Sequence, residues 1–270
     1  MDDLAVLRLQ LEWGADEALE EAPVDRLRAA APPPPATLPQ GEREQNEPLP
    51  SLAEAGRGEG VTHPLAARAM EAAAGATSLN ELRAAIGAFD GCALRDTASH
   101  LIFAEGDPSA DLLLVGEPPA ADDDRSGTAF AGPAGAYLDR MLAAIQLDRT
   151  KLLLTPLIPW RPPGDRPPNP TELAVCLPFL HRLIALAAPR RLLLMGLLVA
   201  RTLLPQAGSR RRPRGAWIEI PIPGTPLVIP ALPTFSPAEL IRDPKNRRPA
   251  WEDLQLLRRT LDEDASAGAP

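Results

Sequence analysis

Residues 111–142 read DLLLVGEPPAADDDRSGTAFAGPAGAYLDRML, and this stretch decides both the expected fold and the place of a ligand site. An apolar run at 112–115 has the character of a buried strand and leads into Gly116 and Glu117. An acidic loop follows, then the small-residue segment 130–135, then an amphipathic helix. Open α/β sheets bind their ligands at the carboxyl ends of the strands. Glu117 and Phe130 therefore predict a tight pocket with one acid and one aromatic wall, suited to a small ring.

Short apolar runs alternate with helical patterns along the rest of the C-terminal part. Ser78 and Glu81 have the spacing of a capping box, which predicts a helix that ends near Phe89. Further helices are expected at 134–146, 171–188, 197–204 and 249–263, strands at 111–115, 151–155, 191–195 and 226–230, and an edge strand or hairpin near 217–220. This alternation is typical of a parallel sheet covered on both faces. We therefore expect an α/β protein, a three-layer α/β/α sandwich around a short, mostly parallel sheet.

Composition divides the chain into an N-terminal arm and a domain. Proline supplies 33 of the 270 residues, about 12% against a usual ~5%. Residues 22–76 are rich in Pro, Glu and Ala without a sustained apolar period, which predicts a disordered linker. Residues 1–21 have apolar side chains near helical spacing, which predicts a short amphipathic helix that packs on the domain or docks a partner. We expect the domain at 77–264 and a flexible tail at 265–270.

The net charge of −8 is distributed unevenly along the chain. Residues 1–100 contain 17 acidic and 8 basic side chains, whereas residues 101–270 contain 19 acidic and 20 basic ones. Between Arg190 and Arg248 there are 11 basic and 3 acidic residues. Because the acidity belongs to the N-terminal part, the whole-chain charge does not argue against a polyanionic partner.

Several classes of protein are disfavoured by what the sequence lacks. Only Cys92 and Cys176 occur, so a disulfide framework is not implied. Residues 1–21 lack the basic start and long apolar run of a signal peptide. We find no stretch with the ~20 apolar residues of a membrane span and no phosphate-binding Gly-x-x-x-x-Gly-Lys loop. We expect a cytoplasmic monomer with no membrane partner.

The amino-acid sequence of residues 111–142 resembles the first motif of the uracil-DNA glycosylase superfamily, in particular that of family 4. The family pattern is Gly-Glu-Ala-Pro-Gly, a few acidic residues, Gly-x-Pro-Phe-Val-Gly-x-Ala-Gly and then a helix. The likeness continues in order and spacing through 161–164 and 234–238 to 250–254. Matching residues in the first motif are Gly116, Glu117, Pro119, Asp124, Gly127, Phe130, Gly132, Ala134 and Gly135. The resemblance implies an α/β/α sandwich and DNA as the partner.

The resemblance also implies roles for individual residues. Glu117 matches the glutamate that positions or activates the attacking water. The alternative is a carboxylate that holds backbone amides of its own loop. Phe130 matches the aromatic residue that stacks on the extruded base, and its alternative is ordinary core packing. Gly116 and Pro156 are the other expected substrate-binding positions.

Three positions depart from the family pattern. Pro156 stands where the family has an Asn that reads the uracil edge, and proline has no side-chain donor or acceptor. Ser236 replaces the histidine that donates to the leaving uracil oxygen; its hydroxyl can still donate one hydrogen bond but is never cationic. The loss of one such donor costs about 10²–10³ in rate in other enzymes. Ala120 replaces the last glycine of the first motif. These changes favour a weakened or broadened enzyme, or a DNA binder without activity.

The cysteine positions bear on a cofactor that the resemblance implies. Family 4 enzymes hold a structural [4Fe–4S] cluster with four cysteines. Two of those positions are Cys92 and Cys176 here, and the other two are Phe89 and Trp160. Because a cluster normally needs four thiolates, we expect no metal and no cofactor, with both cysteines acting as small buried hydrophobes.

Two arginine-rich segments predict a surface that contacts DNA phosphates. The first is 209–214 and the second 242–248, which begins shortly after the Ser236 motif. A single basic run is usually a solvated loop, but two runs favour a DNA footprint with strong salt dependence. The predicted contacts are Arg210, Arg211, Arg212, Arg214, Arg242, Lys245, Arg247 and Arg248.

Two main hypotheses of different classes follow from these observations, and another nucleotide-handling α/β hydrolase is a third alternative. The first is an enzyme of base excision repair that hydrolyses the N-glycosidic bond of a flipped uracil or other deaminated base, with Glu117 and Ser236 as its catalytic residues. The second is a catalytically degenerate module of the same fold that binds DNA or tethers protein partners through its N-terminal arm.

Overall fold

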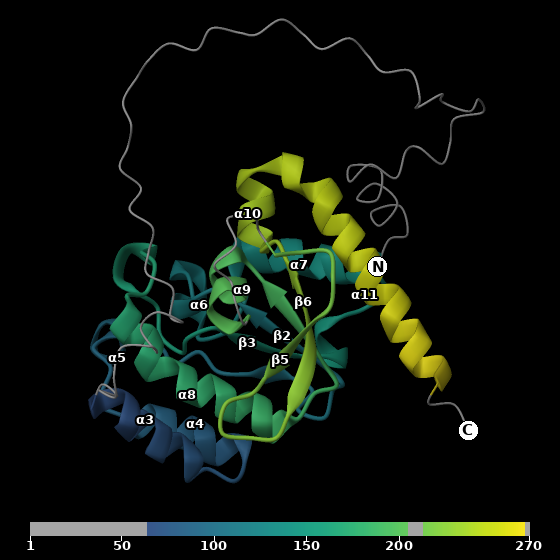
Figure 1. The fold of residues 1–270 in the computed structure, drawn as a ribbon. Helices are drawn as coiled ribbons and strands as arrows, with labels where there is room; N and C mark the ends of the chain where they lie inside the picture. The colour runs from purple at the N-terminus through teal and green to yellow at the C-terminus, as the bar shows by residue number, and fades with distance from the viewer. Residues whose placement is uncertain (1–63, 205–212, 268–270) are drawn as a thin grey trace, which may run out of the picture.

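The computed structural model describes residues 64–204 and 213–267, and a six-stranded sheet forms their centre (Figure 1). The strand order is β1-β3-β2-β4-β6-β5. The inner four strands are parallel, and the two edge strands, β1 and β5, are antiparallel to their neighbours. The strands are β1 Glu105–Gly106, β2 Leu112–Gly116, β3 Leu153–Pro156, β4 Arg191–Met195, β5 Ile218–Pro221 and β6 Val228–Thr234. The predicted mostly parallel sheet is confirmed.

Alternation along the buried strands divides the interior into two cores. All five residues of β2 are buried, and successive side chains point to opposite faces of the sheet. Leu113 and Val115 join the core on one face, whereas Leu112 and Leu114 join the core on the other. A strand buried on both faces needs a continuous apolar run, which explains the uninterrupted Leu/Val composition of this segment.

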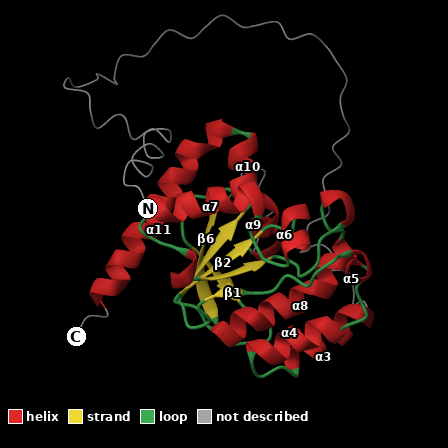
Figure 2. Cartoon of the chain, turned by 180° about the vertical axis from the view of Figure 1, so that it is seen from behind, coloured by secondary structure: helices red, strands yellow, loops and turns green. Residues whose placement is uncertain are grey.

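Helices cover both faces of the sheet, so the predicted three-layer sandwich is confirmed (Figure 2). One layer contains α3 Pro64–Ala74, α4 Leu79–Ala88, α8 Pro170–Ala187 and α9 Leu197–Leu203. The opposite layer contains α7 Gly132–Ala144, α10 Pro237–Arg242 and α11 Arg247–Ala267. Shorter elements connect them: α5 Leu94–Thr97, α6 Ala121–Ser126, η2 Arg149–Lys151, η3 Pro163–Asp165 and η4 Pro244–Asn246.

Helix α8 is the long core helix beneath the sheet. Asn169 begins it with a capping box, because its side chain accepts from the amide of Glu172 while Glu172 accepts from the amide of Asn169. Arg166 donates two further hydrogen bonds to the Glu172 carboxylate, at 2.9 and 2.6 Å. The helix is long and apolar enough to cross a bilayer by length and composition. Its buried face packs against the sheet and α3, as in the core helix of a folded domain.

The structure corrects several predicted boundaries. The predicted linker 22–76 is wrong at its C-terminal end, because residues 64–74 form α3 and bury Ala69 and Ala73 against the domain. The predicted tail 265–270 begins too early, since α11 extends to Ala267. The amphipathic helix 1–21 and the linker up to residue 63 lie outside the described residues.

Besides α3 and the single-turn elements α5, η2, η3 and η4, three short elements were not predicted from the sequence. The acidic loop after Glu117 contains the helix α6, the motif after Thr234 contains the helix α10, and β1 adds two residues to the sheet edge. These elements are six residues long or shorter, so hydrophobic periodicity cannot reveal them. Strand β6 also begins and ends later than the predicted 226–230.

Candidate functional site

The parallel strands end at one edge of the sheet, and the predicted site residues follow those ends. Gly116, the last residue of β2, is paired with Pro156, the last residue of β3. On the other side of β2, β4 ends at Met195, which is paired with Thr234 of β6. The chain positions just beyond these ends are Glu117, Gly196 and Ser236. The tertiary structure therefore gathers at one sheet edge residues that lie up to about 120 positions apart, as the strand-end rule predicts.

Glu117 extends across the end of the neighbouring strand β4. Gly196, the residue after that strand, has a φ of 114°, which favours glycine. A β-carbon built on Gly196 would lie 2.5 Å from Cγ and 2.7 Å from Oε1 of Glu117. The missing side chain at position 196 therefore leaves the space in which the half-buried Glu117 side chain lies.

Phe130 forms a wall against the backbone of Gly116. A β-carbon at Gly116 would lie 2.1 Å from the ring atom Cζ of Phe130, so only glycine allows this approach. The ring comes from the loop between α6 and α7, where Phe130 has a φ of 53°, an uncommon value for a bulky residue. The ring thus packs on Gly116, the last residue of β2, and the acid Glu117 is the next residue in the chain.

Two other predicted site residues, Ser236 and Pro156, are buried close to the ends of β6 and β3. Ser236 is buried and begins α10: its hydroxyl accepts from the amide of Glu239, and the Glu239 carboxylate accepts from the Ser236 amide. The Ser-x-x-Glu spacing could have revealed this capping box in the sequence. Pro156 is buried at the end of β3 and offers no side-chain donor at the sheet edge.

A buried acid that contacts the 234–238 segment could not be predicted from the sequence. Asp253 of α11 is 0% exposed and accepts a 2.8 Å hydrogen bond from the hydroxyl of Thr234, at the end of β6. Burial raises the pKa of Asp253, and the Thr234 hydrogen bond and the charge of Arg214 oppose that rise. Arg214 pairs with Asp253 at 3.1 Å and also with Glu252. In the structure the Arg214 guanidinium links the segment before β5 to α11, and its predicted contact with DNA stays a prediction.

Comparison with known proteins identifies the family. The sequence pattern of the Uracil DNA glycosylase superfamily matches residues 103–255, more than half of the chain. The chain belongs to this superfamily. The match extends from the segment before β1 to α11 and so includes the whole sheet and the edge that carries Glu117 and Phe130.

Individual relatives point to one branch of the superfamily. A protein of Pyrobaculum aerophilum named Type-4 uracil-DNA glycosylase is 30% identical over 183 residues, which are 66% of this chain and 92% of the relative. A protein of the same name from Sulfurisphaera tokodaii is 27% identical over 186 residues, 67% of this chain and 84% of the relative. A third, from Archaeoglobus fulgidus, is 34% identical over 105 residues, 39% of this chain and 53% of the relative.

The residues present do not fit the four-cysteine cluster that the family 4 resemblance implies. The Sγ atoms of Cys92 and Cys176 lie 3.9 Å apart, and both cysteines are buried. Phe89 packs edge-on against Phe179 with ring centroids 5.3 Å apart, and Trp160 is 3% exposed. The two aromatic side chains occupy core volume where the family pattern has thiolates. Within the described residues, no group of three or more His, Cys, Asp or Glu side chains is placed to hold a metal ion.

Apart from Arg214, the predicted DNA-contact residues separate into three groups in this superfamily member. Arg242, Lys245 and Arg248 are exposed on α10, η4 and the start of α11, directly after the Ser236 motif. Arg247 is half-buried, with its guanidinium 5.9 Å from the ring centroid of Tyr137. Arg210, Arg211 and Arg212 lie outside the described residues. The second basic run is thus the part of the predicted surface that the structure places near the site.

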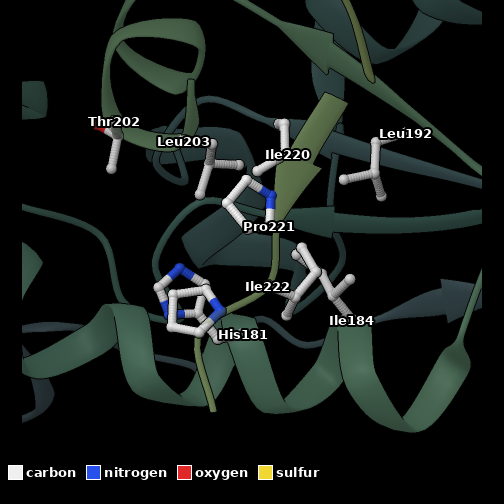
Figure 3. A pocket seen from close by; sticks show the side chains of 9 residues that line it. His181, Ile184, Leu192, Thr202, Leu203, Ile220, Pro221 and Ile222 are labelled. Carbon is white, nitrogen blue, oxygen red and sulfur yellow. The ribbon is translucent and has the colours of Figure 1, made fainter. Parts of the chain in front are cut away.

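A cavity of about 140 Å³ lies elsewhere in the domain, between α8, α9 and β5 (Figure 3). His181 and Ile184 of α8 line it together with Ile220 and Pro221 of β5. Because β5 is antiparallel to β6, the end of β5 lies beside the first residues of β6, at the amino edge of the parallel strands. This cavity is therefore separate from the edge that carries Glu117. Burial lowers the pKa of His181 to about 4.

Proposed function

We propose that this chain is a DNA glycosylase that hydrolyses the N-glycosidic bond of uracil, or of another deaminated base, in a nucleotide flipped out of DNA. The observation that carries the proposal is the pairing of Glu117, extended over Gly196, with Phe130, packed on Gly116, at the carboxyl edge of a glycosylase-superfamily sheet. The relatives named Type-4 uracil-DNA glycosylase support the same reaction class.

The first task of such a site is to hold the extruded base. Enzymes of this kind take the base out of the stack and read it in a pocket. The ring of Phe130 offers a flat apolar face for stacking, and Gly116 lets a planar ligand approach the backbone. Pro156 supplies no side-chain hydrogen bond for reading a base edge. We therefore expect the site to select by shape and stacking and to accept deaminated bases beyond uracil.

The second task is to stabilise charge as the glycosidic bond breaks. The bond electrons leave with the base, and the sugar becomes cation-like, as in other glycoside hydrolyses. The Glu117 carboxylate supplies the negative charge that stabilises this sugar cation and orients the water whose oxygen forms the new bond to the sugar carbon. The water proton passes to the carboxylate, which then releases it to solvent, and the base anion takes up a proton from solvent, so that the carboxylate is regenerated. No step requires a redox group.

Ser236 is the candidate donor to the leaving base among the site residues that the structure describes. The Ser236 hydroxyl accepts from the Glu239 amide, and its own proton is still available for donation because a hydroxyl does both. A neutral hydroxyl stabilises a developing anion less than a cationic group does. We therefore expect slow turnover compared with a site that has histidine at this position.

The second candidate function is a DNA-binding module without activity. The observation that favours it is the engagement of Ser236 in a helix cap, together with the absence of a donor at Pro156. In that case the basic residues Arg242, Lys245 and Arg248 bind DNA, and the N-terminal arm tethers a protein partner. For either function we propose a cytoplasmic monomer that has no iron–sulfur cluster.

Excision assays distinguish the two functions. Single- and double-stranded oligonucleotides carrying uracil, hypoxanthine or xanthine are incubated with the protein, and abasic sites are revealed by alkaline cleavage. The enzyme is expected to cut at least one substrate, and Glu117→Gln is expected to lower the rate by about 10²–10⁴-fold. If no substrate is cut while DNA is still bound, the binding module is the correct function. Cutting that is unchanged in Glu117→Gln would remove Glu117 from the mechanism.

A further inference from the structure

The backbone of Phe130 is held in a conformation that its own sequence disfavours. Its φ of 53° lies in the left-handed region, where a bulky residue persists only when its surroundings enforce it. The carbonyl oxygen of Phe130 also lies against Gly135, where a β-carbon would come within 1.6 Å of it. The ring of Phe130 therefore depends on a specific loop geometry for its position over Gly116.

Arg149 fixes that geometry through the carbonyl groups of the loop. Its guanidinium donates to the carbonyl of Ala129 at 3.1 Å, to that of Phe130 at 2.8 Å and to that of Gly135 at 3.2 Å. The fourth donor, Nε, binds the carboxylate of Asp139 at 2.6 Å. One side chain from the segment before β3 thus joins Ala129 and Phe130 of the loop to Gly135 and Asp139 of α7.

Two acids hold the amide groups of the same loop. Glu105 of β1 accepts from the amide of Ala129 at 2.8 Å. Asp123 of α6 accepts from the amide of Ala131 at 2.6 Å and from the amide of Ala120 at 2.8 Å. The residues on both sides of Phe130 are therefore bound by charged side chains from three separate elements. Charge-assisted hydrogen bonds of this kind are stronger than neutral ones.

We propose that Arg149 is a positioning residue for base recognition, which with Glu105 and Asp123 sets the ring of Phe130 against Gly116 before DNA binds. The inference rests on the proposed function, because the ring is the stacking wall of that site. Arg149 acts only through Phe130, and its loss allows the loop to leave the left-handed conformation. The wall is then misplaced, and a misplacement of about 1 Å in an active site can cost 10²-fold in rate.

A double-mutant cycle between Arg149 and Phe130 tests this inference. The four proteins are wild type, Arg149→Gln, Phe130→Ala and the double variant, assayed on the oligonucleotide that wild type cuts best. We expect Arg149→Gln to lower kcat/KM by about 10–10²-fold when Phe130 is present, mainly through KM, and by less than about 3-fold when Phe130 is already Ala. Equal losses in both backgrounds would show that Arg149 acts independently of the ring and would overturn the proposal.

Two further variants separate positioning from general stability. Arg182 also donates to a backbone carbonyl, that of Ala76, but in the helix layer on α8. Arg182→Gln is expected to lower the melting temperature without changing KM. Arg149→Lys keeps the charge but not the planar fork, so we expect an intermediate KM. If Arg182→Gln raises KM as much as Arg149→Gln does, the effect is one of stability and the proposal fails.

A measurement that does not need catalysis keeps the inference separate from the proposed function. Nuclear Overhauser contacts between the Phe130 ring and the Gly116 α-protons are expected in wild type and in Arg182→Gln, and are expected to be lost in Arg149→Gln. If wild type excises no base, the proposed enzymatic function fails while these contacts still decide the role of Arg149. Contacts that persist unchanged in a folded Arg149→Gln protein would overturn the proposal.

Discussion

The side chain of Glu117 lies against the α-carbon of Gly196. Glu117 follows β2 and Gly196 follows the neighbouring strand β4, so the Glu117 side chain occupies space that a side chain at position 196 would fill. β2 and β4 are hydrogen-bonded neighbours, which brings the two positions together although 79 residues separate them in the chain. Catalytic side chains need support that fixes their rotamer. The glycine provides this support by leaving a defined space.

Gly196→Ala is the most direct test of that relationship. The new methyl group would lie 2.5 Å from Cγ of Glu117, and the φ of 114° adds backbone strain of about 1–3 kcal/mol. We expect excision to fall by about 10²-fold, with a smaller fall in the binding of undamaged DNA. Single-turnover excision and equilibrium DNA binding measure the two effects. Gly224→Ala, in the turn after β5, also has a positive φ but open space around it, so it is the matched control. Equal losses in the two variants would mean that backbone strain is the cause.

The exposed part of the basic surface predicts a specific salt dependence. Replacing Arg242 and Arg248 together by Gln removes two phosphate contacts, so the slope of log Kobs against log salt should become shallower by roughly 1.4 on single-stranded DNA. Fluorescence anisotropy at several salt concentrations measures the slope. Arg190→Gln, an exposed arginine beside Asp111 and Asp264 at the amino edge of the sheet, should leave it unchanged. An unchanged slope in the double variant would place the DNA path elsewhere.

Arg214 should behave differently from those surface residues. Its removal leaves the buried carboxylate of Asp253 without its charged partner. Breaking a buried pair in this way costs about 3–5 kcal/mol, and we expect Arg214→Met to lower the free energy of unfolding by an amount of that order. Urea denaturation measures it. The double variant Arg214→Met with Asp253→Asn should recover part of the loss, and no recovery would mean that the pair is not the source of the stability.

His181 predicts a pH dependence of folding stability. Its pKa is lowered by burial from 6.5 to about 4 in the folded protein. Folding therefore favours the neutral imidazole, and its contribution to folding stability is fully present above pH 6.5. Between pH 6.5 and 4 the unfolded chain binds a proton at His181 and the folded chain does not, so stability falls as the pH is lowered through this range. At 1.36 kcal/mol per pH unit the loss is roughly 3 kcal/mol. Urea denaturation of wild type and His181→Leu at pH 7.5, 5.5 and 4.5 measures this change. A wild-type pH dependence that is unchanged in His181→Leu would assign it to other groups.

The filled core around Cys92 and Cys176 predicts a protein without iron. The purified protein should be colourless, with no iron–sulfur absorption in the visible range, and chelators should not lower its melting temperature. Phe89, packed on Phe179, should instead contribute by burial: Phe89→Ala is expected to cost about 3–5 kcal/mol. A brown protein with stoichiometric iron would contradict this prediction.

The sheet could be predicted from the sequence because its strands are apolar on both faces. Residues 112–115 and 192–195 are short runs of Leu with Val or Met, each preceded by a charged residue and followed by glycine. A run that is apolar at every position is stable mainly as a strand buried on both faces. The same local logic predicted the helix after Ser78. Helices α6 and α10 were not predicted, because six residues form fewer than two helical turns and show no clear hydrophobic period. Their formation depends more on capping and tertiary packing than on periodicity.

The site was predicted in part for a similar reason. Glu117, Phe130 and Gly116 belong to one continuous motif, and their proximity follows from their spacing. The partners of that motif could not be found in this way. Gly196 and Arg149 come from other parts of the chain, and a lone glycine or arginine has no pattern of its own. The pairing of Arg214 with Asp253 could not be predicted either, because the local sequence around a basic loop residue does not show whether it contacts solvent or a buried acid.

The sequence by itself determined the superfamily, the sandwich architecture and the motif that contains an acid and an aromatic ring. Each of these depends on local sequence motifs and on hydrophobic periodicity. Only the tertiary structure decided how the ring and the acid are held. Phe130 needs charged partners from β1, α6 and the segment before β3, and Glu117 needs the empty space at Gly196. Such contacts depend on strand order and on the crossing of distant segments, which no local pattern of residues encodes.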